Sequence, residues 1–205
     1  MISDYIEVGF AYPWIRVPQE MYHLNPVIHI QGVEMLFKSR LGPFTLQFES
    51  QYGEQRRAHT MIPPAFADAK GMAKDTQMEF DATRITGINI KLLGQQSTLR
   101  LGYTQAEVSA ESTGITHHPH IKSVGFKLNL HNVLIASEYA ERVSDGALLF
   151  PYQQSQYLSL GYRLRRSTPY VIYAEVDEGR ELSPVALVQT STSFGWRYEL
   201  SATSA

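Results

Sequence analysis

Positively charged side chains recur at the polar positions of several alternating segments, often close to a glycine. In the stretch from Ile121 to Glu141, for example, Lys127 follows Gly125 on the polar face. Glycines and long cations together suit a water-filled interior, in which the cations would act on dissolved ions through their charge. The ordinary solvated face of a soluble sheet has the same composition, so these residue types alone leave both interpretations open. The candidate cations are Arg100, Lys127, Arg142, Arg163 and Arg197.

Histidines cluster at positions 117, 118 and 120, where they could in principle ligate a metal ion. They lie in a polar segment without a cysteine or carboxylate at a metal-binding spacing, so an exposed loop is the better interpretation and no metal site is predicted. Serine-nucleophile motifs, phosphate-binding glycine loops and dinucleotide fingerprints are absent from the sequence. We therefore expect neither an enzyme nor a cofactor.

Length and composition limit the class of protein. A chain of 205 residues fits one large all-β domain. A formal net charge of −2 leaves no basic excess to neutralise a phosphate backbone, which argues against nucleic acid as a partner. Cysteine is absent, so disulfides and thiolate sites are excluded. No apolar run approaches the roughly 18 to 20 residues of a membrane helix.

The elements that would position the cations are β-strands. From Ser123 to Leu130 the residues alternate strictly between an apolar and a polar face, which is the period of a strand with one apolar side. After His131 and Asn132 the alternation resumes up to Arg142, so two strands meet across a very short connection. This arrangement is typical of a β-hairpin.

The same unit recurs along the chain, and about nine strands are predicted between residues 28 and 200. Short connections follow residues 41, 92, 130 and 165, whereas longer ones follow residues 53, 109, 143 and 177. The segment from Gly53 to about Met78 is expected to be a surface excursion. Alternation of short and long connections predicts an up-and-down antiparallel sheet with all tight turns at one end. Transmembrane β-barrels have this asymmetry.

Three phrases carry a resemblance to a known family: DYIEVGFAYPWIRVPQEMY from Asp4, YLSLGYRLRRSTPYVIYAEVD from Tyr157, and SFGWRYELS from Ser193. Together with the order of strands and turns, they resemble the Gram-negative outer-membrane general-diffusion porins, which are trimeric 16-stranded barrels. The resemblance covers nearly the whole chain. Family members have strands before the first phrase and end on an aromatic residue, so it implies a single porin domain over residues 1–205 that is incomplete at both ends.

The resemblance also implies a function and a site. Residues 1–27 would be the loop that narrows the channel, and residues 28–200 the strands of a partial transmembrane barrel in the bacterial outer membrane. Small hydrophilic solutes and ions would diffuse through it passively, outer-membrane lipid would surround it, and a homotrimer is expected. Charges on the loop would face the cations of the wall and set the selectivity. The loop residues so assigned are Asp4, Glu7, Arg16 and Glu20.

Two alternatives stay open at this point. A soluble or surface β-sandwich or barrel acting as a binding module would show the same alternation, with its apolar face turned inward. An outer-membrane lipase or protease barrel is also compatible, because its catalytic residues would be scattered along the sequence. Dependence on detergent during purification would separate the soluble class from the membrane class.

Overall fold

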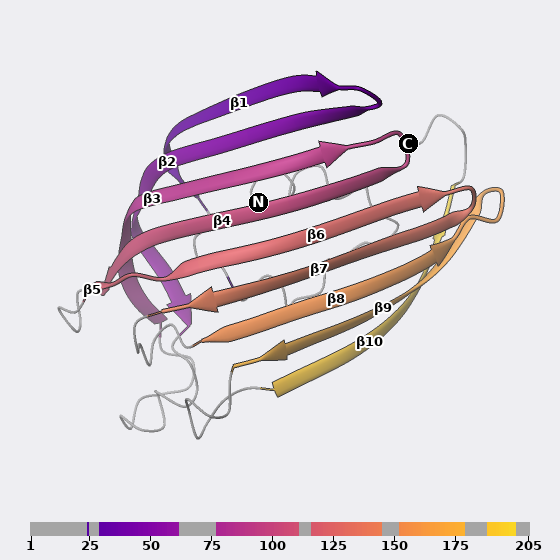
Figure 1. Cartoon of the computed structure of the whole chain (residues 1–205). Helices are drawn as coiled ribbons and strands as arrows, with labels where there is room; N and C mark the ends of the chain where they lie inside the picture. The colour runs from indigo at the N-terminus through magenta and orange to yellow at the C-terminus, as the bar shows by residue number, and fades with distance from the viewer. Residues whose placement is uncertain are drawn as a thin grey trace.

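The computed structural model describes residues 24, 29–61, 77–110, 116–144, 152–178 and 188–199. These residues form one sheet of ten strands, in which all neighbouring strands run antiparallel (Figure 1). The described part of the chain contains no helix long and apolar enough to cross a membrane. The strands are β1 Gln31–Leu41, β2 Phe44–Met61, β3 Gln77–Leu93, β4 Ser97–Ala110, β5 Thr116–His117, β6 His120–Leu130, β7 Val133–Val143, β8 Gln153–Tyr162, β9 Ser167–Asp177 and β10 Val188–Tyr198.

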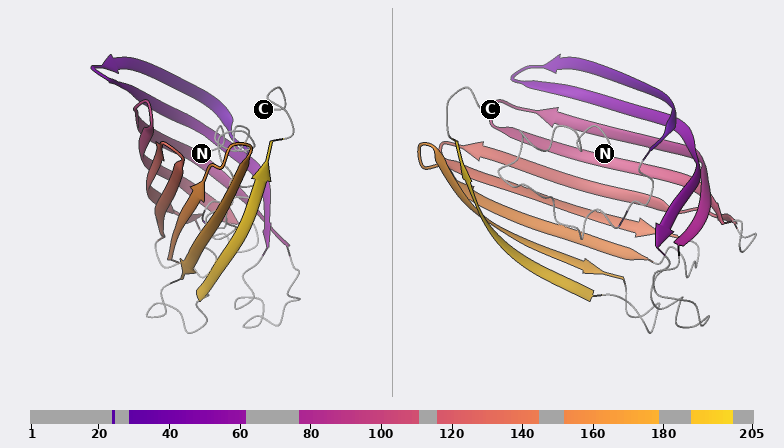
Figure 2. Two further views of the ribbon diagram at one scale, coloured as in Figure 1. Left: turned by 90° about the vertical axis from the view of Figure 1, so that its right-hand side faces the viewer. Right: turned by 180° about the vertical axis from the view of Figure 1, so that it is seen from behind.

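Strands that follow one another in sequence are neighbours in the sheet. The order is β1-β2-β3-β4-β6-β7-β8-β9-β10, and the short β5 pairs with β4 beside this path. The predicted all-β, antiparallel, up-and-down architecture is therefore confirmed. Within the described sheet β1 and β10 each have one neighbouring strand, so they form its two edges. Figure 2 shows that the sheet is strongly curved, with one concave and one convex face.

The tight connections lie at one end of the sheet, as predicted. They span residues 42–43, 94–96, 131–132 and 163–166, while the longer connections join the strands at the opposite end. Gly42 adopts a positive φ of 59°, a conformation that glycine accepts without steric cost. His131 reaches φ 54° in the two-residue connection between β6 and β7. The backbone thus reverses abruptly where the sequence alternation is interrupted.

The expected surface excursion from Gly53 to about Met78 is wrong at its start, because β2 continues to Met61. Its end agrees within one residue, since β3 begins at Gln77. The pairing of β2 with β3 shifts register between Gly53 and Gln55 and again before Ala58, and Arg57 has a φ of 52°. Such β-bulges add residues to one strand and break the two-residue period without ending the strand. Because the bulges interrupt the alternation of apolar and polar residues, the sequence pattern does not predict this part of the sheet.

Apolar side chains gather on one face because cross-strand partners share a face. One row of partners runs from Phe48 on β2 through Ile90, Leu101 and Val124 to Tyr139 on β7. A parallel row on the β8–β10 side joins Leu160, Val171 and Phe194. Most of these side chains are exposed, up to 83% for Phe194. We call this the outer face, and the opposite, concave face the inner face.

Candidate functional site

The inner face carries a row of acidic, basic and small residues that crosses the sheet from β2 to β8. Lys91 on β3 pairs in register with Arg100 on β4, which is followed by Gly125 on β6 and Glu138 on β7. Gln47 on β2 and Tyr157 on β8 continue the row on either side. Charges of both signs therefore lie on the face where the sequence analysis predicted cations.

The first ion pair of this wall joins Lys91 and Glu49. The Lys91 Nζ lies 3.0 Å from Glu49 Oε1, and the two side chains are 13% and 11% exposed. Gln47 also donates a side-chain hydrogen bond to this carboxylate. Because both charged groups are largely removed from bulk water, their attraction is screened less than that of an exposed pair.

The second ion pair crosses a whole strand. Arg100 on β4 donates a hydrogen bond to the carboxylate of Glu138 on β7, passing over β6 at Gly125. These side chains are 14% and 15% exposed. A Cβ added to Gly125 would lie 3.5 Å from Arg100 Nε, which is ordinary contact. Glycine at this position therefore leaves the path of the guanidinium open, while a long side chain would occupy it.

The other predicted wall cations differ in their surroundings. Lys127 lies on the inner face, in register with Thr98 and Ala136. Arg197 on β10 pairs with the buried Thr168, and its guanidinium is 3.9 Å from Glu199.

Arg163 does not lie on a strand, contrary to the expectation from sequence. β8 ends at Tyr162, and Arg163 is exposed in the connection to β9, where its backbone amide donates to the carbonyl of Asn132 over 2.7 Å. The alternation of leucines continues for two residues past the end of the strand, which explains why the pattern misplaced it. The loop residues Asp4, Glu7, Arg16 and Glu20 lie outside the described residues.

Arg142 lies on the inner face but is only 5% exposed. Its Nη1 donates a hydrogen bond to the backbone carbonyl of Leu24 over 3.0 Å, and the carboxylate of Glu178 provides a favourable charge interaction. The side chain of Arg142 therefore holds another part of the chain instead of presenting its charge to water.

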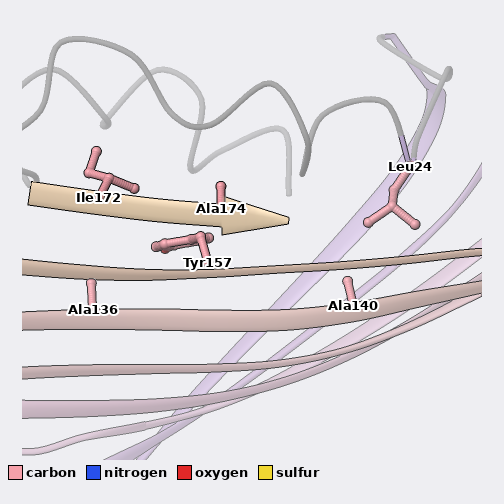
Figure 3. Packing of buried hydrophobic residues seen from close by; sticks show 6 residues of the cluster. All are labelled: Leu24, Ala136, Ala140, Tyr157, Ile172 and Ala174. Carbon is pink, nitrogen blue, oxygen red and sulfur yellow. The ribbon is translucent and has the colours of Figure 1, made fainter. Parts of the chain in front are cut away.

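Sequence reasoning missed an apolar patch on the inner face of β7–β9. Leu24 packs there in one buried cluster with Ala136, Ala140, Tyr157, Ile172 and Ala174, and Figure 3 shows the Leu24 side chain pointing toward the sheet. Three alanines at the polar positions of their strands were the available signal. Because their side chains are small, another segment can approach the sheet closely at this place.

The described residues contain no group of three or more histidine, aspartate or glutamate side chains that could hold a metal ion. The inner face presents fixed charges of both signs, which act electrostatically on dissolved ions near them. The outer face, in contrast, presents exposed leucine, phenylalanine, tyrosine and tryptophan side chains.

A curved antiparallel meander with an apolar convex face and a polar concave face is the arrangement of outer-membrane β-barrels. No family model and no curated protein sequence matches the chain. Among solved structures, it is similar to in-vitro folded OmpT, an outer membrane protein of Vibrio cholerae, with a TM-score of 0.53 and 11% identity over 82% of this chain and 55% of that chain. A loop L8 deletion mutant of OmpT gives a TM-score of 0.50 and 11% identity, over 82% of this chain and 53% of that chain.

At this identity the likeness establishes the fold alone. The chain has the fold of an outer-membrane β-barrel and spans about half the length of the structures it matches. The expected location in the bacterial outer membrane agrees with the location of these neighbours.

Proposed function

We propose that this chain is part of an outer-membrane porin through which small hydrophilic solutes and ions diffuse passively. The observation that supports this best is the opposite chemistry of the two faces. The outer face exposes large apolar side chains, such as Leu101 at 49% and Phe126 at 40%. The inner face carries two ion pairs, Lys91 with Glu49 and Arg100 with Glu138.

Each face fits a different solvent. Lipid satisfies the apolar outer face, and water solvates the charged inner face. Backbone groups inside a bilayer need internal partners, which a closed antiparallel barrel supplies through hydrogen bonds between strands. The edges β1 and β10 each have one neighbour in the described sheet, so closure by further strands is part of this proposal.

The soluble alternative fits the exposures less well. In a β-sandwich the apolar face packs inward and the polar face meets water. Here the apolar side chains of β8, Leu158 and Leu160, are 44% and 43% exposed, whereas Ser155 and Ser159 on the opposite face are each 1% exposed. The proposal therefore places lipid against the outer face and assigns no catalytic step to the inner face.

The test uses the full-length protein encoded by the gene that contains this chain. It is folded in detergent, checked by its heat-modifiable migration, and inserted into planar bilayers and into liposomes. We expect stepwise conductance, and liposome swelling rates that fall as the size of an uncharged sugar increases. A folded protein that gives neither would overturn the proposal. Hydrolysis of peptide or ester substrates by the same preparation would favour the barrel-enzyme alternative instead.

The homotrimer implied by the porin resemblance belongs to the same proposal. The mass of the folded protein in detergent, after correction for bound detergent, should be three times that of the single chain. A monomeric mass together with unchanged conductance would refute the trimer and leave the proposed channel function standing.

A further inference from the structure

Leu24 contacts the sheet far from its own place in the sequence. Its backbone carbonyl accepts a hydrogen bond from Arg142, 118 residues away, over 3.0 Å. Its side chain is 1% exposed and belongs to the buried cluster on β7–β9. Both the backbone and the side chain of Leu24 are thus fixed to the inner face (Figure 3).

The hydrogen bond from Arg142 stabilises the position of Leu24 against the sheet. A guanidinium buried without an acceptor is costly, so an arrangement that moves the Leu24 carbonyl away leaves the charge less well compensated. Glu178, one residue past the end of β9, interacts favourably with the same charge. The hydrogen bond from Arg142 therefore favours an arrangement in which Leu24 lies against the wall.

The wall is shaped for this contact. Ala140 lies two residues before Arg142 on the same face of β7 and is 1% exposed, and Ala174 on β9 is 0% exposed. Larger side chains at these positions would hold Leu24 away from the strands. Small wall residues, an apolar side chain and a buried donor therefore act together at one place.

We propose that Leu24 and Arg142 form an internal anchor that fixes the chain at Leu24 to the inner face of β7–β9. If the chain forms the proposed channel, the anchor determines which part of the channel cross-section is occupied by protein. This effect on permeation rests on the proposed function. Arg142 is in this view a positioning residue, which does not need to touch a passing solute.

The anchor is tested directly by thiol labelling. The 205 residues contain no cysteine, so Leu24→Cys provides a single reporter once any cysteine elsewhere in the full-length protein has been replaced by serine. Ser193→Cys, on the exposed inner face of β10, is the matched accessible control. With the full-length protein folded in detergent, a small water-soluble thiosulfonate should label position 24 at least about tenfold more slowly than position 193. Adding Arg142→Met should raise the labelling rate at position 24 about tenfold, since a hydrogen bond to a charged group is lost.

Two further variants keep the result decisive. Arg142→Lys retains the charge and a donor, so it should give a rate between those of the parent and Arg142→Met. Ala140→Leu displaces Leu24 from the wall while leaving Arg142 intact, and it decides the matter if Arg142→Met does not fold. Arg166→Met, which changes an exposed arginine in a tight turn, is the control and should leave the rate unchanged.

Rapid labelling of position 24 in the parent would overturn the anchor. Slow labelling that neither Arg142→Met nor Ala140→Leu accelerates would overturn the role given to these residues. In bilayers, the anchor variants should change the single-channel conductance while Arg166→Met does not. Faster labelling with unchanged conductance would overturn the effect on permeation alone. If the parent forms no channel, the porin proposal fails, and the labelling result still decides the anchor.

Discussion

Phe126→Arg tests which face of the sheet meets lipid. Phe126 lies on the outer face of β6, is 40% exposed, and is in register with Leu99 on β4 and Ser137 on β7. The next residue, Lys127, points to the inner face of the same strand. Lys127→Glu is therefore a matched control that introduces a charge change at nearly the same depth in the membrane.

The expected cost follows from the position of Phe126 along its strand. Outward apolar neighbours lie on both sides of it, Val124 in one direction and Leu128 in the other, so it is not at the border of the apolar band. An arginine at the lipid face of a barrel costs roughly 2 to 4 kcal/mol near the midplane and about 0 to 1 kcal/mol near the interfaces. We expect a cost of about 2 to 3 kcal/mol for Phe126→Arg. For Lys127→Glu we expect less than about 1 kcal/mol, because its inner position faces the water of the proposed channel.

The measurement is the free energy of folding into lipid vesicles, taken from urea titrations of the full-length protein that are shown to be reversible. A cost for Phe126→Arg equal to that of Lys127→Glu would refute the assignment of the faces. A larger cost for Lys127→Glu would mean that the faces are reversed or that lipid does not contact this sheet.

Three further predictions concern the inner face. Glu138→Gln removes a carboxylate that pairs with Arg100 and makes the net charge of the wall more positive by one. The reversal potential under a salt gradient should therefore shift toward anion selectivity. An unchanged reversal potential at intact conductance would exclude these residues from the path of ions. Gly125→Leu should displace Arg100 from its route over β6 and lower the conductance measurably, whereas Gly125→Ala should be mild because its Cβ makes only ordinary contact. Gly195→Ala should destabilise the folded protein by about 1 to 3 kcal/mol through its clash with the Tyr170 ring, and the cost should largely vanish in a Tyr170→Ala background; an equal cost in both backgrounds would refute the clash.

The two-residue period predicted the faces of the strands correctly because burial alternates with the pleat wherever pairing is regular. It placed Gly125 and Lys127 together on the polar face of β6, and their registers with Arg100 and Ala136 confirm that both lie on the inner face. It failed where the backbone departs from the regular pleat. The bulges near Gly53 and Arg84 shift the phase of the pattern, so the loop-side ends of β2 and β3 were lost.

The pairing of charges could not be predicted from the sequence. Glu138 follows Arg100 by 38 residues, and they meet only because the register aligns both with Gly125 on the intervening strand. Arg142 looked like one more wall cation, since alternation records which face a residue occupies and not what lies against it. The contact with Leu24 depends on two segments with no shared pattern.

The paired charges change how the wall is expected to act on ions. A wall of cations alone would attract anions strongly, but Lys91 lies beside Glu49 and Arg100 beside Glu138, so much of the field cancels within the wall itself. Reversing Arg100 to glutamate would put two carboxylates together in a place where both side chains are largely buried, and the result would mix misfolding with selectivity. Neutralising one acid instead changes a single charge of the wall and introduces no second carboxylate. In the proposed channel, we therefore expect the sign of the ion selectivity to depend as much on these acids as on the cations that the sequence makes conspicuous.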